Sequence, residues 1–126
     1  MNNIKRFFAS LCVAFLILSA SCASAPYASK SVLVLYNAGT YEGTGEGYTG
    51  PILLRVTVSS QAITDIEVLG HTETPGLGSV AIEELSDTVI DANSTDVDGI
   101  SGASASSNGF LSAVEDALLK AKPNKP

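Results

Sequence analysis

The fold is decided by residues 51–69, PILLRVTVSSQAITDIEVL. Apolar side chains occupy every second position from Leu54 to Val58, which is the pattern of a β-strand with one buried face. A polar turn, Ser-Ser-Gln, follows at 59–61, and apolar residues recur through residues 62–70. Two such segments around a short polar turn predict a β-hairpin.

Two further strands are expected before this hairpin. Residues 32–36, VLVLY, form a short apolar run and predict a short strand. Residues 41–48, YEGTGEGY, place glycines among aromatic residues and threonine. That composition fits an irregular, bulged strand better than a helix.

The pattern changes after Pro75, and residues 79–92, SVAIEELSDTVIDA, repeat apolar side chains at helical spacing. We expect Ser79 to cap this helix at its N-terminus. Glu83 and Glu84 are expected in its early turns, where the helix dipole favours negative charge.

A second helix is predicted over residues 108–122, whose apolar side chains fall on one face. Ser106, Ser107 and Asn108 are its expected N-caps, and Pro123 ends it. Two helices and an antiparallel sheet together predict a single small α+β domain.

The first 21 residues have the order of an export signal. Lys5 and Arg6 precede the apolar run ASLCVAFLILSA, and small residues follow it. We therefore predict a signal peptide over 1–21, a polar tether over 22–31, a folded domain over 32–122 and a tail over 123–126.

The residues LSAS before Cys22 resemble the lipobox of bacterial lipoproteins, in which the cysteine becomes lipidated and N-terminal. Cleavage after the small-x-small sequence Ala23-Ser24-Ala25 is the alternative, although the following proline should hinder it. Cys12 lies inside the signal, so the processed chain keeps one cysteine without a disulfide partner. We expect an exported protein, lipid-anchored to a bacterial membrane and facing the periplasm or the cell exterior.

The processed chain is strongly acidic. Removal of 21 residues leaves 105 and takes the formal net charge from −6 to −8, because Lys5 and Arg6 are lost. Nucleic-acid binding needs clustered lysine and arginine, so we expect no nucleic-acid partner.

Three other kinds of chemistry are disfavoured by the sequence. Residues 45–50 formally match the dinucleotide fingerprint GxGxxG, but Pro51 and a strand follow where that motif must open a helix. A bulged strand and a strand kept bare for a flat ligand both fit these glycines. His71 has no second histidine to complete a metal site, so a surface or hydrogen-bonding role is expected. The serines near Gly102 lack the G-x-S-x-G turn of hydrolases.

The loop over residues 98–110, DGISGASASSNGF, has the features of an anion site. Unpaired N–H groups and the dipole at a helix N-terminus favour a phosphate. Gly102 and Ala103 keep the backbone accessible, and the surrounding serines supply hydroxyl donors. Helix caps are rich in serine and glycine for structural reasons too, so plain capping also fits these residues.

The same loop resembles the signature of the FMN-binding domain family, Asp-x-x-(Ser/Thr)-Gly-Ala-Thr-x-(Ser/Thr), over D-G-I-S-G-A-S-A-S at residues 98–106. Two further segments are similar: Y-x-x-G-T-Y-x-G-x-G-x-G-Y-x-G-P at 36–51 and H-x-E-T-P-G-L-G at 71–78. The resemblance covers residues 36–121. This family includes the periplasmic flavoprotein subunits of Rnf and sodium-translocating quinone reductase complexes.

The resemblance implies that FMN is the cofactor and that its phosphate is joined to the hydroxyl of Ser104, where the family generally has threonine. Asp98 matches the motif aspartate and is implied to hold the loop or to aid recognition by the attaching enzyme. The attachment turn is implied to be shaped by Ser101, Gly102, Ala103, Ser106 and Ser107. The motif at residues 71–78 is implied to border the isoalloxazine ring or the ribityl chain of the flavin, with Leu77 as the apolar contact. The residues concerned are Glu73, Thr74, Gly76, Leu77 and Gly78.

A separate Mg²⁺-dependent flavin transferase, with FAD as donor, is implied to make the bond. We expect an electron carrier outside the cytoplasm rather than a stand-alone enzyme, with redox partner proteins, no catalytic residue and no metal. Two alternatives stay open: a module that binds flavin noncovalently, and a structural surface lipoprotein without a cofactor.

Overall fold

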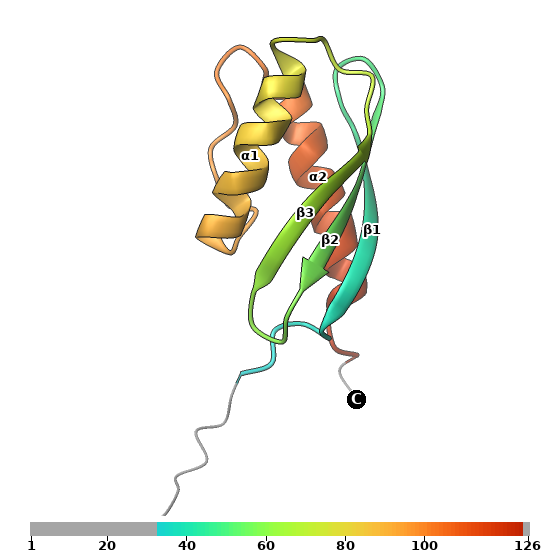
Figure 1. Ribbon diagram of the computed structural model, residues 1–126, viewed down its shortest axis with the longest axis vertical. Helices are drawn as coiled ribbons and strands as arrows, with labels where there is room; N and C mark the ends of the chain where they lie inside the picture. Colours follow the sequence, from blue (N-terminus) through green and yellow to red (C-terminus); the bar gives the residue numbers. More distant parts are fainter. Residues whose placement is uncertain (1–32, 125–126) are drawn as a thin grey trace, which may run out of the picture. The chain divides into compact units, whose positions relative to one another are not determined.

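A computed structural model describes residues 33–124 (Figure 1). The predicted signal peptide, Cys22 and the tether up to residue 31 lie outside the described residues. The described chain is one small α+β domain, with three antiparallel strands and two helices, as the sequence predicts.

The sheet contains β1 (Gly39–Glu46), β2 (Pro51–Val58) and β3 (Ile63–Gly70) in the order β1-β2-β3, and all pairs are antiparallel. The predicted hairpin is confirmed, since β2 pairs with β3 across the turn at residues 59–62. The expected strand over 32–36 is not formed in the part that the structure describes. Its backbone instead crosses the end of the sheet, and Leu35 N–H donates to Ser60 O at 2.8 Å.

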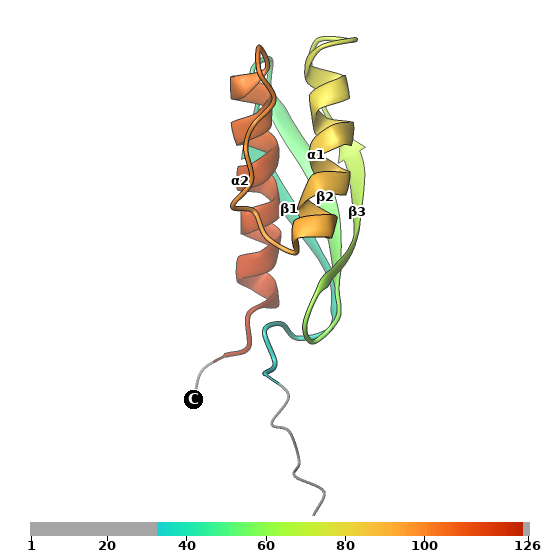
Figure 2. The same cartoon turned by 90° about the vertical axis from the view of Figure 1, so that its left-hand side faces the viewer.

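Both helices, α1 (Gly78–Ala92) and α2 (Ser104–Ala121), cover the same face of the sheet (Figure 2). The core lies between the sheet and the two helices. Its large side chains come from β2, β3 and both helices. The opposite face of the sheet carries charged and polar side chains together with the exposed Leu53 and Leu69. Arg55 at its centre bridges Glu42 and Glu67, each at 3.0 Å.

The glycines of β1 do not form the expected bulge, because β1 and β2 pair in unbroken register along their full length. The register shifts lie between β2 and β3 instead. Gly43 and Gly45 face α2, and a Cβ on either would overlap a backbone carbonyl oxygen of that helix, at Ala113 or Gly109. These glycines therefore serve close packing of a helix on a strand.

Both helices begin earlier than the sequence predicts. Helix α1 starts at Gly78 with Leu77 as its N-cap residue, and the Ser79 hydroxyl accepts from Gly76 N–H at 3.1 Å instead of capping. Glu83 and Glu84 lie in the second turn of α1, and its first turn, where the helix dipole acts most strongly, contains no acidic residue.

Helix α2 starts at Ser104, with Ala103 as its N-cap residue, rather than near residue 108. The serine hydroxyls that were expected to cap it lie within its first turn, where they bond to other groups. No helix within residues 33–124 is long and apolar enough to cross a bilayer.

Candidate functional site

A cleft of about 450 Å³ lies at the end of the domain where α2 begins. Its size falls within the range of about 300–1,000 Å³ that is usual for small-molecule sites. In Figure 1 this end is opposite the C-terminus. Three segments far apart in sequence form its lining: Tyr48 after β1; Thr74, Leu77 and Gly78 before α1; and Gly102, Ala103, Ser104, Ala105 and Ser106 at the start of α2.

The structure thus brings together the motifs at residues 71–78 and 98–106. Of the predicted site residues, Thr74, Leu77, Gly78, Gly102, Ala103, Ser104 and Ser106 line the cleft. The lining does not include Glu73, Gly76, Asp98, Ser101 or Ser107. Sequence reasoning missed Tyr48 and Ala105, although Tyr48 lies within the glycine-rich segment that was identified.

Ser104 is exposed and is the first residue of α2. The turn before it is closed by a hydrogen bond of 3.0 Å from Ala103 N–H to Ile100 O. Gly102 in this turn has a φ of +83°, a conformation that side chains with a Cβ rarely adopt. Ser104 therefore lies at a helix N-terminus, where free N–H groups and the helix dipole favour an anion.

The other serines of the loop are engaged or point elsewhere. Ser107 is fully buried; its hydroxyl donates to Ala103 O at 2.8 Å and accepts from Ile100 N–H at 2.9 Å. Ser106 is only 4% exposed and donates to the Glu73 carboxylate. Ser101 is exposed but does not line the cleft. Among the serines of this loop, Ser104 is both exposed and part of the cleft wall.

Glu73 is a buried carboxylate behind the cleft, 4% exposed. Besides the Ser106 hydroxyl, it accepts hydrogen bonds from Thr49 N–H at 3.1 Å and from Thr49 Oγ1 at 3.5 Å. Burial raises the pKa of Glu73, but the hydrogen bonds from Ser106, Thr49 and the backbone of Tyr48 outweigh it and hold the pKa below its ordinary value.

Two glycines leave room for this carboxylate. A Cβ on Gly47 would overlap a Glu73 carboxylate oxygen, and one on Gly78 would lie 2.9 Å from Glu73 Cβ. The backbone N–H of Glu73 donates to His71 Nδ1 at 3.2 Å, so His71 has a local hydrogen-bonding role. No group of three potential metal ligands occurs among residues 33–124.

The remaining predicted residues lie in loops. Gly76 has a φ of +80°, and the turn containing it places Leu77 at the rim with 51% of its surface exposed. Asp98 is exposed in the connection between α1 and α2. The fingerprint at residues 45–50 leads from β1 directly into β2, so it opens no helix, as expected.

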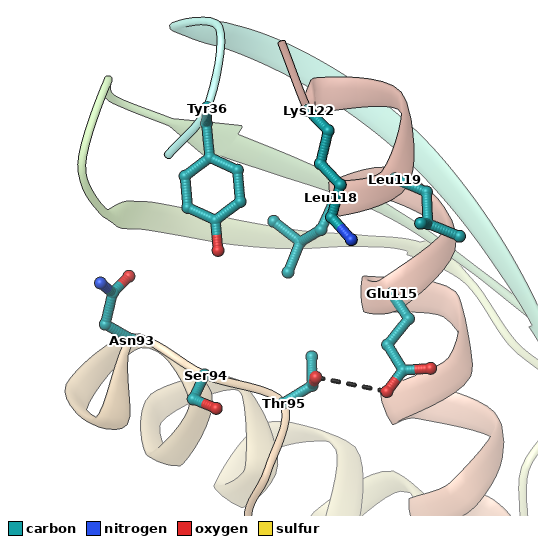
Figure 3. A pocket seen from close by; sticks show the side chains of 8 residues that line it. All are labelled: Tyr36, Asn93, Ser94, Thr95, Glu115, Leu118, Leu119 and Lys122. Atoms are coloured by element: carbon teal, nitrogen blue, oxygen red, sulfur yellow. Dashed lines mark hydrogen bonds between the residues drawn. The ribbon is translucent and has the colours of Figure 1, made fainter. Parts of the chain in front are cut away.

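A second cavity, of about 340 Å³, lies beside the C-terminal half of α2 (Figure 3). Its walls come from the segment before β1, the connection after α1 and the outer face of α2. Across it, the Thr95 hydroxyl donates to the Glu115 carboxylate at 3.3 Å. Its lining contains none of the predicted site residues.

Residues 47–119 match the FMN-binding domain family. The chain is 38% identical over 85 residues to an uncharacterized protein of Treponema pallidum, covering 68% of this chain and 24% of that protein. It is 33% identical over 89 residues to the NADH:acrylate oxidoreductase of Vibrio harveyi, covering 71% and 9%. It is 31% identical over 125 residues to the urocanate reductase of Eggerthella lenta, covering 94% and 21%.

The chain therefore spans less than a quarter of the length of these relatives. The matched family residues include both cleft-forming motifs and most of the core. The cleft fits the cofactor in size, in its bare backbone near Ser104 and in the helix N-terminus at one wall. The chain belongs to the FMN-binding domain family, and its cofactor is FMN.

Proposed function

We propose that this protein is an electron carrier outside the cytoplasm whose FMN is joined to Ser104 through a phosphoester bond. The observation that carries the proposal is the position of Ser104, an exposed residue that forms part of the cleft wall. The neighbouring hydroxyls of Ser106 and Ser107 are buried and hydrogen-bonded within the protein.

The attachment is a phosphoryl transfer from FAD, catalysed by a separate Mg²⁺-dependent flavin transferase. The Ser104 oxygen bonds to the phosphorus on the riboflavin side of the diphosphate, the bond from that phosphorus to the bridging oxygen breaks, and AMP leaves. The hydroxyl proton passes to a base of the transferase, because no basic side chain of this chain borders Ser104 in the cleft lining. No oxidant or reductant is consumed.

Each segment of the cleft has a separate task. The N-terminus of α2 holds the phosphate, and the small residues Gly102 and Ala103 let it approach the backbone. Tyr48 and Leu77, exposed at the rim, offer apolar surface to the flavin ring. Bound FMN supplies one- and two-electron chemistry, and the protein supplies attachment, orientation and electrostatics.

Export and lipidation at Cys22 complete the proposal. A covalent bond and a membrane tether serve one purpose, since a cofactor lost outside the cell is not recovered. Relatives named as an NADH:acrylate oxidoreductase and a urocanate reductase contain a similar domain within longer chains. We infer that this domain passes electrons to or from partner proteins of that reductase type.

The test is co-expression of the full chain with a flavin transferase, followed by denaturing electrophoresis. Covalent flavin remains fluorescent in the denatured band, and intact mass should increase by FMN minus water. Ser104→Ala should abolish both signals, whereas Ser104→Thr should keep them because it retains the hydroxyl. Flavin that is lost on denaturation would support the noncovalent alternative, and no flavin at all would support a structural role.

A further inference from the structure

We propose that Glu73 is a positioning residue that selects the flavin acceptor: it withdraws the Ser106 hydroxyl and holds the first turn of α2 so that Ser104 faces the cleft. This inference rests on the proposed covalent attachment. It concerns two hydroxyls, on Ser104 and Ser106, that lie two residues apart on one helical turn and both line the same cleft.

Glu73 joins three segments of the site. Its carboxylate accepts from Thr49 N–H at 3.1 Å, in the turn between β1 and β2, and from the Ser106 hydroxyl on α2. Glu73 itself precedes α1. Each of these segments contributes to the cleft wall, so the positions of the walls depend on this carboxylate.

The residues around Glu73 supply hydrogen-bond donors to its carboxylate and leave space for it. Among residues 33–124 no lysine or arginine forms an ion pair with Glu73, and its carboxylate accepts hydrogen bonds from Thr49 and Ser106 instead. Burying a charge without a counter-ion is costly unless hydrogen bonds satisfy it. Space is also reserved, because a Cβ on Gly78 would lie 2.8 Å from Ser106 Oγ and 2.9 Å from Glu73 Cβ.

Ser104 and Ser106 differ in how accessible they are to the phosphorus of the flavin donor. Ser106 is 4% exposed and its hydroxyl donates to Glu73, so this hydroxyl is less accessible to an incoming phosphorus than that of Ser104. Ser104 is exposed and lines the same cleft. The hydrogen bond between Ser106 and Glu73 accounts for a hydroxyl residue at the last position of the motif at residues 98–106. Ser106 binds the carboxylate, and Ser104 binds the phosphate.

The experiment uses the full chain with the flavin transferase and FAD, and maps the labelled residue by peptide mass spectrometry. In wild type the flavin should be on Ser104. Glu73→Ala should lower labelling of Ser104 by about 10- to 100-fold, since a displacement of ~1 Å can cost about that much in rate. In a Ser104→Ala background, Glu73→Ala should expose Ser106 and move residual label to it.

Two variants separate positioning from general loss of structure. Glu73→Gln keeps a group that can accept from Thr49 N–H and donate to Ser106 Oγ, so it should retain most labelling of Ser104. Glu83→Ala, on the exposed face of α1, is the matched control and should label as wild type. If Glu73→Ala fails to fold, Glu73→Gln and Ser106→Ala still decide, because Ser106→Ala cuts the same link and should lower labelling of Ser104.

Amide hydrogen exchange of the unlabelled protein gives an independent readout. Glu73→Ala should raise the exchange rate at Thr49 and in the first turn of α2 more than in the sheet. Glu73→Gln should have the same effect to a smaller extent. Unlabelled wild type would defeat the proposed function but leave this measurement valid. Wild-type labelling in both Glu73→Ala and Ser106→Ala, or unchanged exchange at the α2 turn, would overturn the role of Glu73.

Discussion

The backbone N–H of Thr44 donates to the Asp116 carboxylate at 3.1 Å, which ties the outer edge of β1 to α2. Lys120, one turn further along α2, donates to Glu42 O at 2.8 Å and to Asp116 at 3.0 Å. Two side chains of one helix thus satisfy backbone groups that an edge strand otherwise leaves open to another strand.

Loss of this cover should destabilise the domain and promote association. Asp116→Ala should lower the free energy of unfolding by about 0.5–1 kcal/mol, because the lost contacts are partly exposed. It should also increase dimers or larger species, measured by light scattering during size-exclusion chromatography. Glu83→Ala is the control of equal charge change. A monomeric Asp116→Ala protein at high concentration would argue against a protective role for this contact.

Acid should weaken the fold through two carboxylates. The hydrogen bond from Lys120 and that from Thr44 N–H lower the pKa of Asp116, and the hydrogen bonds to Glu73 lower its pKa despite burial. A carboxyl whose pKa is lower in the folded state contributes stability that is full above its unfolded pKa and is lost as pH falls through its folded pKa. Urea denaturation from pH 7 to pH 3 should therefore show unfolding free energy decreasing below about pH 5. The combined variant Glu73→Gln, Asp116→Asn should flatten this decrease, and an unchanged slope would contradict the assignment.

The packing of β1 against α2 should not tolerate a methyl group. Gly43→Ala and Gly45→Ala should each destabilise by about 1–3 kcal/mol or more, because the added Cβ overlaps backbone that cannot rotate away. Gly70→Ala is the matched control, since a Cβ there meets nothing within 4 Å. Thermal unfolding of the three variants checks the order, and equal melting temperatures would show that the helix can shift.

The turn before Ser104 contains Gly102, whose φ is positive, and we expect both stability and flavin attachment to depend on this residue. Gly102→Ala should cost about 1 kcal/mol, since the residue has a positive φ and the space around it is open. Gly102→Asn should cost less, because asparagine adopts this conformation more readily. We expect flavin attachment to decrease in the order wild type, Asn, Ala, measured as fluorescence of the denatured band. Labelling of Gly102→Ala at the wild-type level would show that the turn adapts.

Local patterns in the sequence were sufficient for much of this molecule. Alternating apolar residues predicted the β2–β3 hairpin, helical spacing predicted most of α1, and the two motifs predicted most of the cleft lining. These features depend on neighbours in the chain, and their period or composition is therefore visible without a fold. The family and its cofactor follow from the same motifs.

Tertiary structure alone decided what the small and polar residues do. Gly43 and Gly45 suggested a bulge, because the helix backbone that excludes their side chains lies about 70 positions further along the chain. Ser106 and Ser107 suggested helix caps, but their hydroxyls bond to Glu73 and to the Ala103 carbonyl, so α2 begins at Ser104. The sequence by itself determined that a hydroxyl would stand at the cleft. Only the packing of three distant segments decided which one is free, since a hydrogen-bond partner supplied across the fold leaves no trace in local sequence.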